Sequence, residues 1–257
     1  MKRVLVTGAA GVIGRALLRN LAGRYELCPL THRPASFPSF VADISDLSAI
    51  APAFENVDAV VHLAAAAAVD APWDAVLEGN IIGTRNVFEA SRMANVPLVV
   101  FASSNHVIGS WERQATAGLY ALEDMRVFDE NTEIRPDSLY GVSKAFGEAL
   151  GRFYSDAFGM RVICLRIGSV LDDDDPRSPA VASSAPWLDL RTEERFARMR
   201  ATWLSQRDCA ELVACALDAQ DVRWVIAYGI SDNPRQFWNL RTAREVLGYC
   251  PQDRSPL

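Results

Sequence analysis

Two residues in the middle of the chain have the types and spacing of a proton-transfer pair. Tyr140 and Lys144 stand four positions apart, directly after the helix-start signal Pro136-Asp137. Residues at i and i+4 of a helix lie on one face. A phenol with a pKa near ~10 is a poor base at neutral pH, but a nearby ammonium favours the phenolate. The spacing therefore predicts that Tyr140 is a general base assisted by Lys144.

A serine that can assist this pair follows an apolar run earlier in the chain. Leu98–Ala102 contains only apolar residues, which is typical of a buried strand, and Ser103-Ser104-Asn105-His106 follows it. Ligands of open α/β sheets bind beyond the carboxyl ends of the strands. We expect the Ser104 hydroxyl to hydrogen-bond the substrate oxygen that Tyr140 protonates or deprotonates. The alternative is that Ser104 only caps the end of its strand.

The N-terminus contains a glycine loop between an expected strand, Val4–Val6, and an expected helix, Val12–Leu21. In such a loop Gly8 permits a tight turn, Gly11 lets the backbone approach a pyrophosphate, and Gly14 allows close helix–strand packing. The start of the helix then offers free N–H groups and the positive end of its dipole to the phosphates. This context predicts a dinucleotide site rather than an ordinary βα turn.

The end of the second expected strand, Glu26–Leu30, bears on which nicotinamide cofactor binds. An acidic residue there would hold the ribose 2′-hydroxyl of NAD. The chain instead continues Thr31-His32-Arg33, without a carboxylate. A guanidinium matches the geometry of a 2′-phosphate, so we expect NADP to be preferred over NAD through Arg33. The alternative is that Arg33 is a solvated loop residue and that NAD is bound.

Apolar strands alternate with amphipathic helices over most of the chain, which predicts a Rossmann-type α/β fold with a doubly wound parallel sheet. We expect one NAD(P)-binding domain over 1–257, with 168–257 supplying most of a small substrate lid. Leu171–Leu190 is expected to be an exposed loop. The remaining expected strands are Asp58–Leu63, Arg161–Ile167 and Trp224–Tyr228, and the remaining helices are Trp73–Ala94, Tyr140–Phe158, Arg207–Ala219 and Arg241–Leu247.

The composition argues against several classes of protein. A net charge of −6 argues against a nucleic-acid partner, which requires a basic face. The five scattered cysteines and three distant histidines indicate neither a disulfide framework nor a metal site. Asp172–Asp175 lack calcium-loop spacing and are expected to form a solvated acidic loop. No segment has the length of a membrane span. We expect a cytoplasmic protein with a small-molecule substrate.

Together these segments resemble the extended, sugar-active branch of the short-chain dehydrogenase/reductase superfamily, the NAD-dependent epimerase/dehydratase family. The resemblance extends from Lys2 to about Gly248, and it implies catalytic roles for Ser104, Tyr140 and Lys144. Besides the segments described above, it is carried by Asp43-Ile44, His62–Ala65, Asn80–Asn86, Phe101–Gly109 and Arg166–Ser169.

The resemblance also implies which residues meet the cofactor. Asp43 and Ile44 would contact the adenine, and Asn80 would support a water network in the active site. Together with Arg33, which the strand-end argument adds, the expected cofactor residues are Gly8, Ala10, Gly11, Val12, Ile13, Gly14, Asp43, Ile44, Leu63, Ala64, Ala65, Asn80, Tyr140, Lys144 and Ile167. Related enzymes pair through helices equivalent to Trp73–Ala94 and Tyr140–Phe158, so a homodimer is expected by analogy.

Within this branch the chain is most similar to the uronate dehydrogenases, which oxidise the anomeric hydroxyl of a hexuronic acid. That similarity implies that Ser104, Asn105 and His106 contact the sugar and that Arg198 clamps its carboxylate. The chain departs from the group in two further places, besides the second strand. Only alanines occupy Ala64–Ala68, where the group has a substrate-binding serine, and Leu171–Glu194 is an insertion next to the expected substrate mouth.

The leading hypothesis is an NAD(P)-dependent dehydrogenase that oxidises a hydroxyl of a sugar or sugar acid. A nucleotide-sugar epimerase or dehydratase is disfavoured, because only about 90 residues follow Ile167. An NADPH-dependent reductase of small aldehydes or ketones stays open, since an alanine-lined pocket suits it. A dinucleotide sensor without catalysis is the alternative outside the enzymes, and the presence of Ser104, Tyr140 and Lys144 argues against it.

Overall fold

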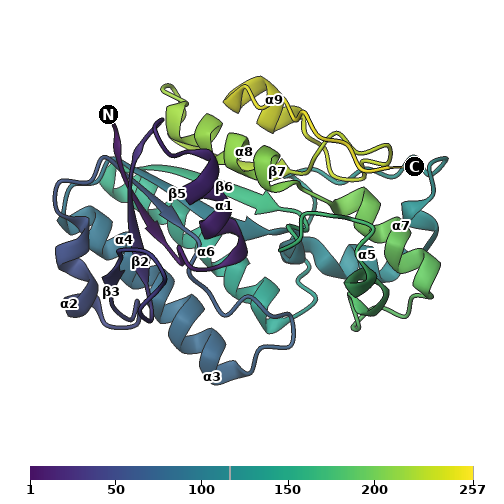
Figure 1. The fold of residues 1–257 in the computed structure, drawn as a ribbon, viewed down its shortest axis with the longest axis horizontal. Helices are drawn as coiled ribbons and strands as arrows, with labels where there is room; N and C mark the ends of the chain where they lie inside the picture. The colour runs from purple at the N-terminus through teal and green to yellow at the C-terminus, as the bar shows by residue number, and fades with distance from the viewer. Residues whose placement is uncertain (116, 257) are drawn as a thin grey trace.

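Seven parallel strands form one sheet in the order β3-β2-β1-β4-β5-β6-β7 (Figure 1). The computed structural model describes residues 1–115 and 117–256. Every pair of neighbouring strands runs parallel. The order reverses next to β1, as in doubly wound sheets, so the predicted Rossmann-type fold is confirmed. The strands are β1 (Arg3–Thr7), β2 (Glu26–Thr31), β3 (Phe40–Val41), β4 (Ala59–His62), β5 (Leu98–Ser104), β6 (Arg161–Ile167) and β7 (Trp224–Gly229).

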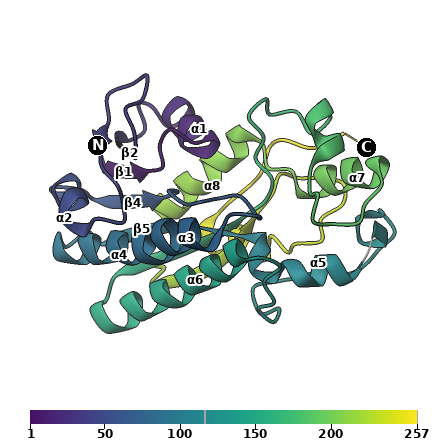
Figure 2. The ribbon, with the colours of Figure 1, turned by 90° about the horizontal axis from the view of Figure 1, so that it is seen from below.

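Helices cover both faces of the sheet. α1 and α8 pack together on one face, and α2, α4 and α6 cover the other, which Figure 2 shows edge-on. α5 and α7 lie beyond the sheet, near its carboxyl edge. The helices are α1 (Val12–Asn20), α2 (Leu47–Ile50), α3 (Trp73–Ala75), α4 (Gly83–Met93), α5 (Gly109–Ala115), α6 (Leu139–Phe158), α7 (Thr192–Thr202), α8 (Gln206–Asp218) and α9 (Arg241–Leu247).

The apolar runs that predicted the strands supply both main cores. Side chains alternate across a strand, so Val4 and Val6 of β1 enter the core under α1 and α8, whereas Leu5 enters the core under α4 and α6. Each face needs an apolar residue at every second position. A strand that is covered on both sides is therefore apolar throughout, and Leu98–Ala102 shows this pattern.

A third core lies beyond the carboxyl ends of the strands. It joins the segment after β5, including Val107 and Ile108, to Tyr228 of β7 and to Phe237 and Trp238 near the C-terminus. Ala201 of α7 belongs to the same cluster. This third core supports the elements that lie over the substrate end of the molecule.

The helix predicted over Trp73–Ala94 is interrupted. Between α3 and α4, residues Val76–Ile82 form a π-helix, η2. Asn80 lies in this π segment and bonds Ala66 and Ser143 instead of solvent. π segments within helices often occur at functional sites, and helical periodicity does not predict them. Three short elements, β3, α2 and α5, were also not predicted.

The segment predicted as an exposed loop, Leu171–Leu190, is buried in part. It contains a 3₁₀ turn, Pro179–Ser183, and the side chains of Val181, Ala185 and Leu188 are buried. An arginine of α7, Arg195, donates a 2.8 Å hydrogen bond to the carbonyl of Ala185. The segment is therefore held against α7, a long-range contact that a local turn composition does not predict.

A buried ion pair joins α6 to three strands. Arg166 of β6 donates to both carboxylate oxygens of Glu148 of α6, at 2.8 and 2.9 Å. Its third nitrogen donates to Tyr228 of β7 at 2.9 Å, and Ser103 of β5 donates to Glu148 at 2.6 Å. Besides each other, Glu148 and Arg166 bond Ser103 and Tyr228, and both of these residues belong to the sheet that α6 covers.

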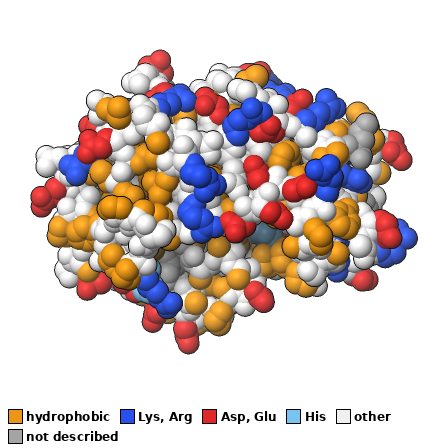
Figure 3. Space-filling model, viewed as in Figure 1, with side chains coloured by type: hydrophobic (Ala, Val, Ile, Leu, Met, Phe, Trp, Pro, Cys, Tyr) orange, Lys and Arg blue, Asp and Glu red, His pale blue; other side chains and the backbone are white. Residues whose placement is uncertain are grey.

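The surface carries charges of both signs. On the face shown in Figure 3, lysine and arginine side chains are interspersed with acidic ones and do not form a single basic patch. None of the helices in the described part of the chain is long and apolar enough to cross a membrane.

His62, at the end of β4, makes the stability of the fold depend on pH. Its ring nitrogens lie 2.8 Å from Thr7 Oγ1 and 3.1 Å from Thr84 Oγ1. Burial, and secondarily the charge of Lys144, lowers the pKa of His62 to about 3. Below pH ~6.5 the imidazole of His62 is protonated in the unfolded chain but stays neutral in the folded chain. Above pH ~6.5 the titration of His62 therefore does not reduce the free energy of unfolding. Below that pH it lowers the free energy of unfolding by about 1.4 kcal/mol per pH unit, down to about pH 3.

We expect the substitution His62→Gln to lower the melting temperature at pH 7.5, because glutamine fills the site less well. Between pH 7.5 and 5.0 the variant should lose about 2 kcal/mol less of its unfolding free energy than the parent protein. Urea unfolding at the two pH values measures this difference. His32→Gln is the control, since His32 is exposed. Equal pH losses in the parent protein and His62→Gln would contradict the role given to His62.

Candidate active site

A cavity of about 900 Å³ lies across the carboxyl ends of β1, β2, β4, β5 and β6. The switch in strand order beside β1 opens this crevice, as it does in other doubly wound sheets. Of the predicted site residues, those that line it are Gly8, Ala10, Gly11, Val12, Ile13, Gly14, Arg33, Ile44, Leu63, Ala64, Ala65, Ser104, Asn105, His106, Tyr140, Lys144, Ile167 and Arg198. Asp43 and Asn80 do not line it.

The glycine loop has the backbone geometry of a phosphate cradle. Gly8 has a φ of +69°, and a Cβ there would lie 2.6 Å from the backbone nitrogen of Ala64. A Cβ on Gly14 would lie 2.5 Å from the carbonyl oxygen of Ala9, so α1 approaches the loop closely. Gly11 precedes α1, and no side chain caps the N–H groups of its first turn. These residues fit a bound dinucleotide pyrophosphate.

The end of β2 lies at one side of the cavity. Thr31, His32 and Arg33 line this part, and His32 and Arg33 are exposed. The side chain of Asp43 accepts a 2.9 Å hydrogen bond from the backbone of Ser45 and lies 3.5 Å from His32. Asp43 does not line the cavity, and its expected contact with adenine stays a prediction. Its neighbour Ile44 does line the wall.

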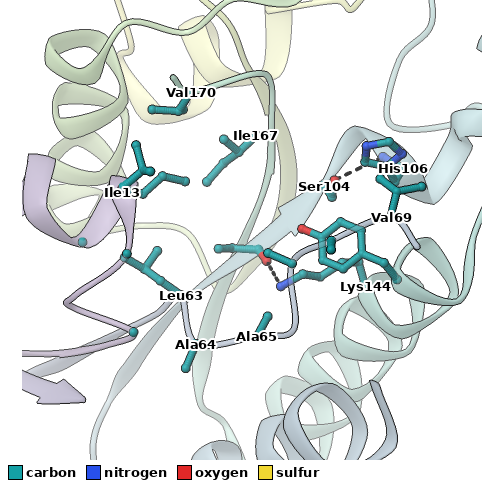
Figure 4. A pocket seen from close by; sticks show the side chains of 18 of the residues that line it. Ile13, Leu63, Ala64, Ala65, Val69, Ser104, His106, Lys144, Ile167 and Val170 are labelled. Carbon is teal, nitrogen blue, oxygen red and sulfur yellow. Dashed lines mark hydrogen bonds between the residues drawn. The ribbon is translucent and has the colours of Figure 1, made fainter. Parts of the chain in front are cut away.

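Ser104, Tyr140 and Lys144 converge on the cavity from two elements. Ser104 is the last residue of β5, and the other two lie on the first turns of α6. Figure 4 shows Ser104 and Lys144 pointing into one space, with Ile13, Ile167 and Val170 across from them. The Ser104 hydroxyl accepts a 3.2 Å hydrogen bond from the backbone of His106, which orients it.

Burial sets the proton affinities of the pair on α6. It lowers the pKa of Lys144 to about 8, and the ammonium donates a 2.7 Å hydrogen bond to the carbonyl of Ala102. It raises the pKa of Tyr140 to about 12, an effect that the hydroxyl of Ser104 reduces. Desolvation is thus the largest effect on the phenol. The lysine nitrogen lies 5.5 Å from the centre of the Tyr140 ring, so the expected effect of Lys144 on the phenolate stays a prediction.

Asn80 has a supporting position behind the cavity. Its amide accepts a 2.7 Å hydrogen bond from the backbone N–H of Ala66 and donates to the Ala66 carbonyl at 3.2 Å. It also donates to Ser143 of α6 at 2.9 Å. Asn80 therefore ties the alanine loop of residues 64–68 to the helix that carries Tyr140. Four alanines of this loop line the cavity.

His106 and Asn105 lie at the substrate side of the cavity. His106 Nδ1 lies 2.8 Å from a carboxylate oxygen of Asp137. Burial would raise the pKa of Asp137, but the hydrogen bond and charge of His106 lower it overall. The His106 ring also meets Trp187 edge-on at 5.5 Å. Trp187 belongs to the segment 171–194, which thus reaches the cavity.

Arg198, predicted to clamp a substrate carboxylate, already holds a carboxylate of the protein. Its Nε and Nη2 atoms donate to Glu112 of α5 at 2.6 and 3.2 Å. Tyr120 donates to the same carboxylate at 2.9 Å. Burial alone would lower the pKa of Arg198, whereas Glu112 raises it. Arg198 still borders the cavity, so its contact with a substrate stays a prediction.

Sequence reasoning missed four residues around the site: Glu112, Asp137, Glu148 and Trp187. Asp137 was noticed only as part of a helix-start signal. The partners of Glu112 and Glu148 lie 86 and 18 residues away along the chain, and no local pattern marks such pairs. Trp187 lies in a segment that the sequence predicts to be an exposed loop. The tryptophan itself was the signal that part of this segment is buried.

The chain is similar to known proteins along most of its length. The profile of the NAD dependent epimerase/dehydratase family matches residues 4–227. An NAD-dependent glucose-6-phosphate dehydrogenase of Haloferax volcanii is 38% identical, covering 98% of this chain and 94% of the relative. An L-arabinose 1-dehydrogenase (NAD(P)(+)) of the same organism is 40% identical, covering 99% and 98%.

A solved structure shows the same architecture with a cofactor bound. It is the crystal structure of a mutant uronate dehydrogenase from Agrobacterium tumefaciens complexed with NAD. Its sequence is 32% identical to this chain, and the superposition gives a TM-score of 0.79. The match covers 99% of this chain and 86% of that chain.

Proposed function

Because the chain belongs to the NAD-dependent epimerase/dehydratase family, we propose that it is a dehydrogenase that oxidises a hydroxyl group of a sugar or sugar acid. The observation that carries the proposal is the convergence of Ser104, Tyr140 and Lys144 on a cavity that continues to the glycine loop. The named activities of its relatives, which oxidise a sugar phosphate, a pentose and uronates, support the same class of reaction.

In this proposal NAD(P)⁺ supplies the hydride acceptor. Ser104 holds the substrate hydroxyl oxygen, and Tyr140 takes its proton as the C–H hydride leaves. With a pKa raised to about 12, Tyr140 is a neutral phenol at pH 7, so it must first release its own proton to solvent and act as the phenolate. Positive charge near the phenol lowers its pKa, and Lys144, with a pKa of about 8, is mostly protonated at pH 7.

The other readings of the sequence have less support. The nucleotide-sugar epimerases among the relatives match only part of the chain and at lower identity than the sugar dehydrogenases. A pure dinucleotide sensor has no need of a serine, tyrosine and lysine that converge beside the cofactor loop. We also propose that residues 168–257 supply most of the substrate lid, since Ser169, Trp187 and Met199 line the cavity.

A screen of cofactor reduction over aldoses, uronic acids and simple alcohols tests the proposed function. We expect reduction with at least one sugar or sugar acid at a rate well above that with simple alcohols. The nicotinamide absorbance at 340 nm follows the reaction. Reduction by simple alcohols alone, or by none of the compounds, would refute the proposal.

For the mechanism, we expect Tyr140→Phe to lower kcat by about 10²–10⁴-fold, because it removes the acceptor of the substrate proton. Binding of the cofactor, measured by calorimetry, should change little. Tyr154→Phe is the matched control on the same helix, since its hydroxyl bonds Glu89 away from the cavity. Near-normal turnover by Tyr140→Phe would overturn the assigned role.

For the cofactor, we propose a preference for NADP through Arg33. The support is the exposed Arg33 side chain just after β2, and the described wall residues of this segment, Thr31–Pro34, include no carboxylate. We expect Arg33→Ala to lower kcat/KM for NADP about tenfold, the weight of one charged contact, and to leave that for NAD within about twofold. Initial rates with both cofactors decide this. A parent protein that prefers NAD would contradict the assignment.

We also propose that the chain forms a homodimer through α4 and α6. The support is a set of exposed apolar side chains on these helices, Met93, Val142, Phe153 and Phe158. Sedimentation equilibrium at micromolar concentration should give twice the mass of the chain, and a monomer would contradict the proposal.

All five cysteines are free, which suits our expectation of a reducing cytoplasm.

A further inference from the structure

Arg198 and Glu112 form a buried ion pair at the substrate side of the cavity. Both residues are at most 5% exposed, and α7 and α5 supply one each. Two nitrogens of the guanidinium meet the two carboxylate oxygens at 2.6 and 3.2 Å, which is the bidentate geometry typical of a strong pair. The hydroxyl of Tyr120 adds a third hydrogen bond to the carboxylate. The pair is therefore well satisfied without any ligand.

This pairing changes what Arg198 offers to a substrate. The positive charge is balanced locally by Glu112, so a second carboxylate that approached Arg198 would also approach a negative charge. Breaking the pair to release the guanidinium would leave Glu112 buried without its counter-ion, which is costly. The hydrogen bonds of Arg198 to Glu112 use Nε and Nη2, which leaves the two N–H groups of Nη1 as the donors that could meet a neutral hydroxyl oxygen.

The other basic groups near the substrate do not replace Arg198. Arg195 donates to the carbonyls of Ala185 and Leu188, and Arg113 donates to that of Trp187. Lys144 is buried against the carbonyl of Ala102, beside the reacting atoms. Arg33 follows β2, and Ser104 ends β5, three strands away in the sheet. At a spacing of ~4.8 Å per strand, Arg33 lies at the far end of the cavity.

The groups that remain at the substrate side are neutral or acidic. Ser104, Asn105 and His106 line it, and His106 is paired with Asp137. Asp70, also in the wall, adds a negative charge. Hydroxyl, amide and imidazole groups are suited to recognising sugar hydroxyls. Among the described residues of this part of the wall, Lys144 is the remaining cation, and its nitrogen is directed at the carbonyl of Ala102 beside the reacting atoms.

We propose that Glu112 sets the substrate specificity by neutralising Arg198, and that the substrate is an uncharged aldose instead of a uronate or a sugar phosphate. This inference rests on the proposed function and narrows it to one class of substrate. Glu112 acts through Arg198 and is therefore a positioning residue for specificity. The reaction is the oxidation of one aldose hydroxyl to a carbonyl; a bound NAD(P)⁺ would supply the hydride acceptor, and Tyr140, after release of its own proton to solvent, would accept the hydroxyl proton as a phenolate.

Matched substrates test the inference directly. D-glucose and D-glucuronate, like D-galactose and D-galacturonate, differ only at C6, and D-glucose 6-phosphate adds a phosphate there; L-arabinose is the neutral pentose. We expect kcat/KM of the parent protein to be at least tenfold higher for a neutral aldose than for its charged partners. A higher value for a uronate or the phosphate would overturn the inference and leave the proposed function standing. No turnover of any sugar would overturn both.

The substitution Glu112→Gln tests the mechanism of the preference. It keeps the size of the side chain and frees the charge of Arg198. We expect kcat/KM for the uronates to rise at least tenfold relative to the matched aldoses, with the change mainly in KM. The control Glu123→Gln removes an exposed carboxylate and should leave the ratio unchanged. An unchanged ratio in a folded Glu112→Gln would overturn the role of Glu112. If that variant does not fold, the ratio in the parent protein still decides the substrate class.

Discussion

The buried pair of Glu148 and Arg166 holds the catalytic helix at a defined position on the sheet. Glu148 lies one helical turn beyond Lys144, and its carboxylate is bonded from both β5 and β6. The helix can sit this close because glycine faces the strands, since a Cβ on Gly147 would lie 2.2 Å from the ring of Phe101. Breaking one partner of such a pair costs about 3–5 kcal/mol. The distances between Ser104 and the residues of α6 depend on this contact.

The burial of α6 against the sheet also sets the pKa values of its two site residues, Lys144 and Tyr140. Lys144 lies against the ring of Phe101 at 5.0 Å, and desolvation brings its pKa to about 8. The phenol of Tyr140 experiences the same desolvation, which works against its ionisation. Burial therefore opposes the charged form of both residues.

At the substrate end, a second buried arginine–glutamate pair has a different consequence. Glu148 and Arg166 lie inside the fold, whereas Arg198 borders the cavity and Glu112 lies behind it. Neutralising a guanidinium in a cavity wall keeps its hydrogen-bond donors but removes its preference for anions. Alanines of the loop 64–68 and Trp187 of the segment 171–194 also line this cavity.

The sequence alone determined the sheet, the glycine loop and the order of Ser104, Tyr140 and Lys144, because these depend on local signals. Apolar runs, glycine spacing and an i,i+4 pair lie within short segments and have the same meaning in any context. It did not predict the π-helix at Asn80 or the burial of Val181 in the insertion.

Only the tertiary structure decided how the charges are paired and how strongly each site residue holds its proton. Arg198 was expected to bind a substrate carboxylate, and its partner Glu112 is 86 residues away in the chain. Desolvation raises the pKa of Tyr140, and the nitrogen of Lys144 donates its hydrogen bond to the carbonyl of Ala102. Ion pairing and pKa values depend on distances and desolvation in the folded chain, and a local pattern of residues predicts neither distance nor desolvation.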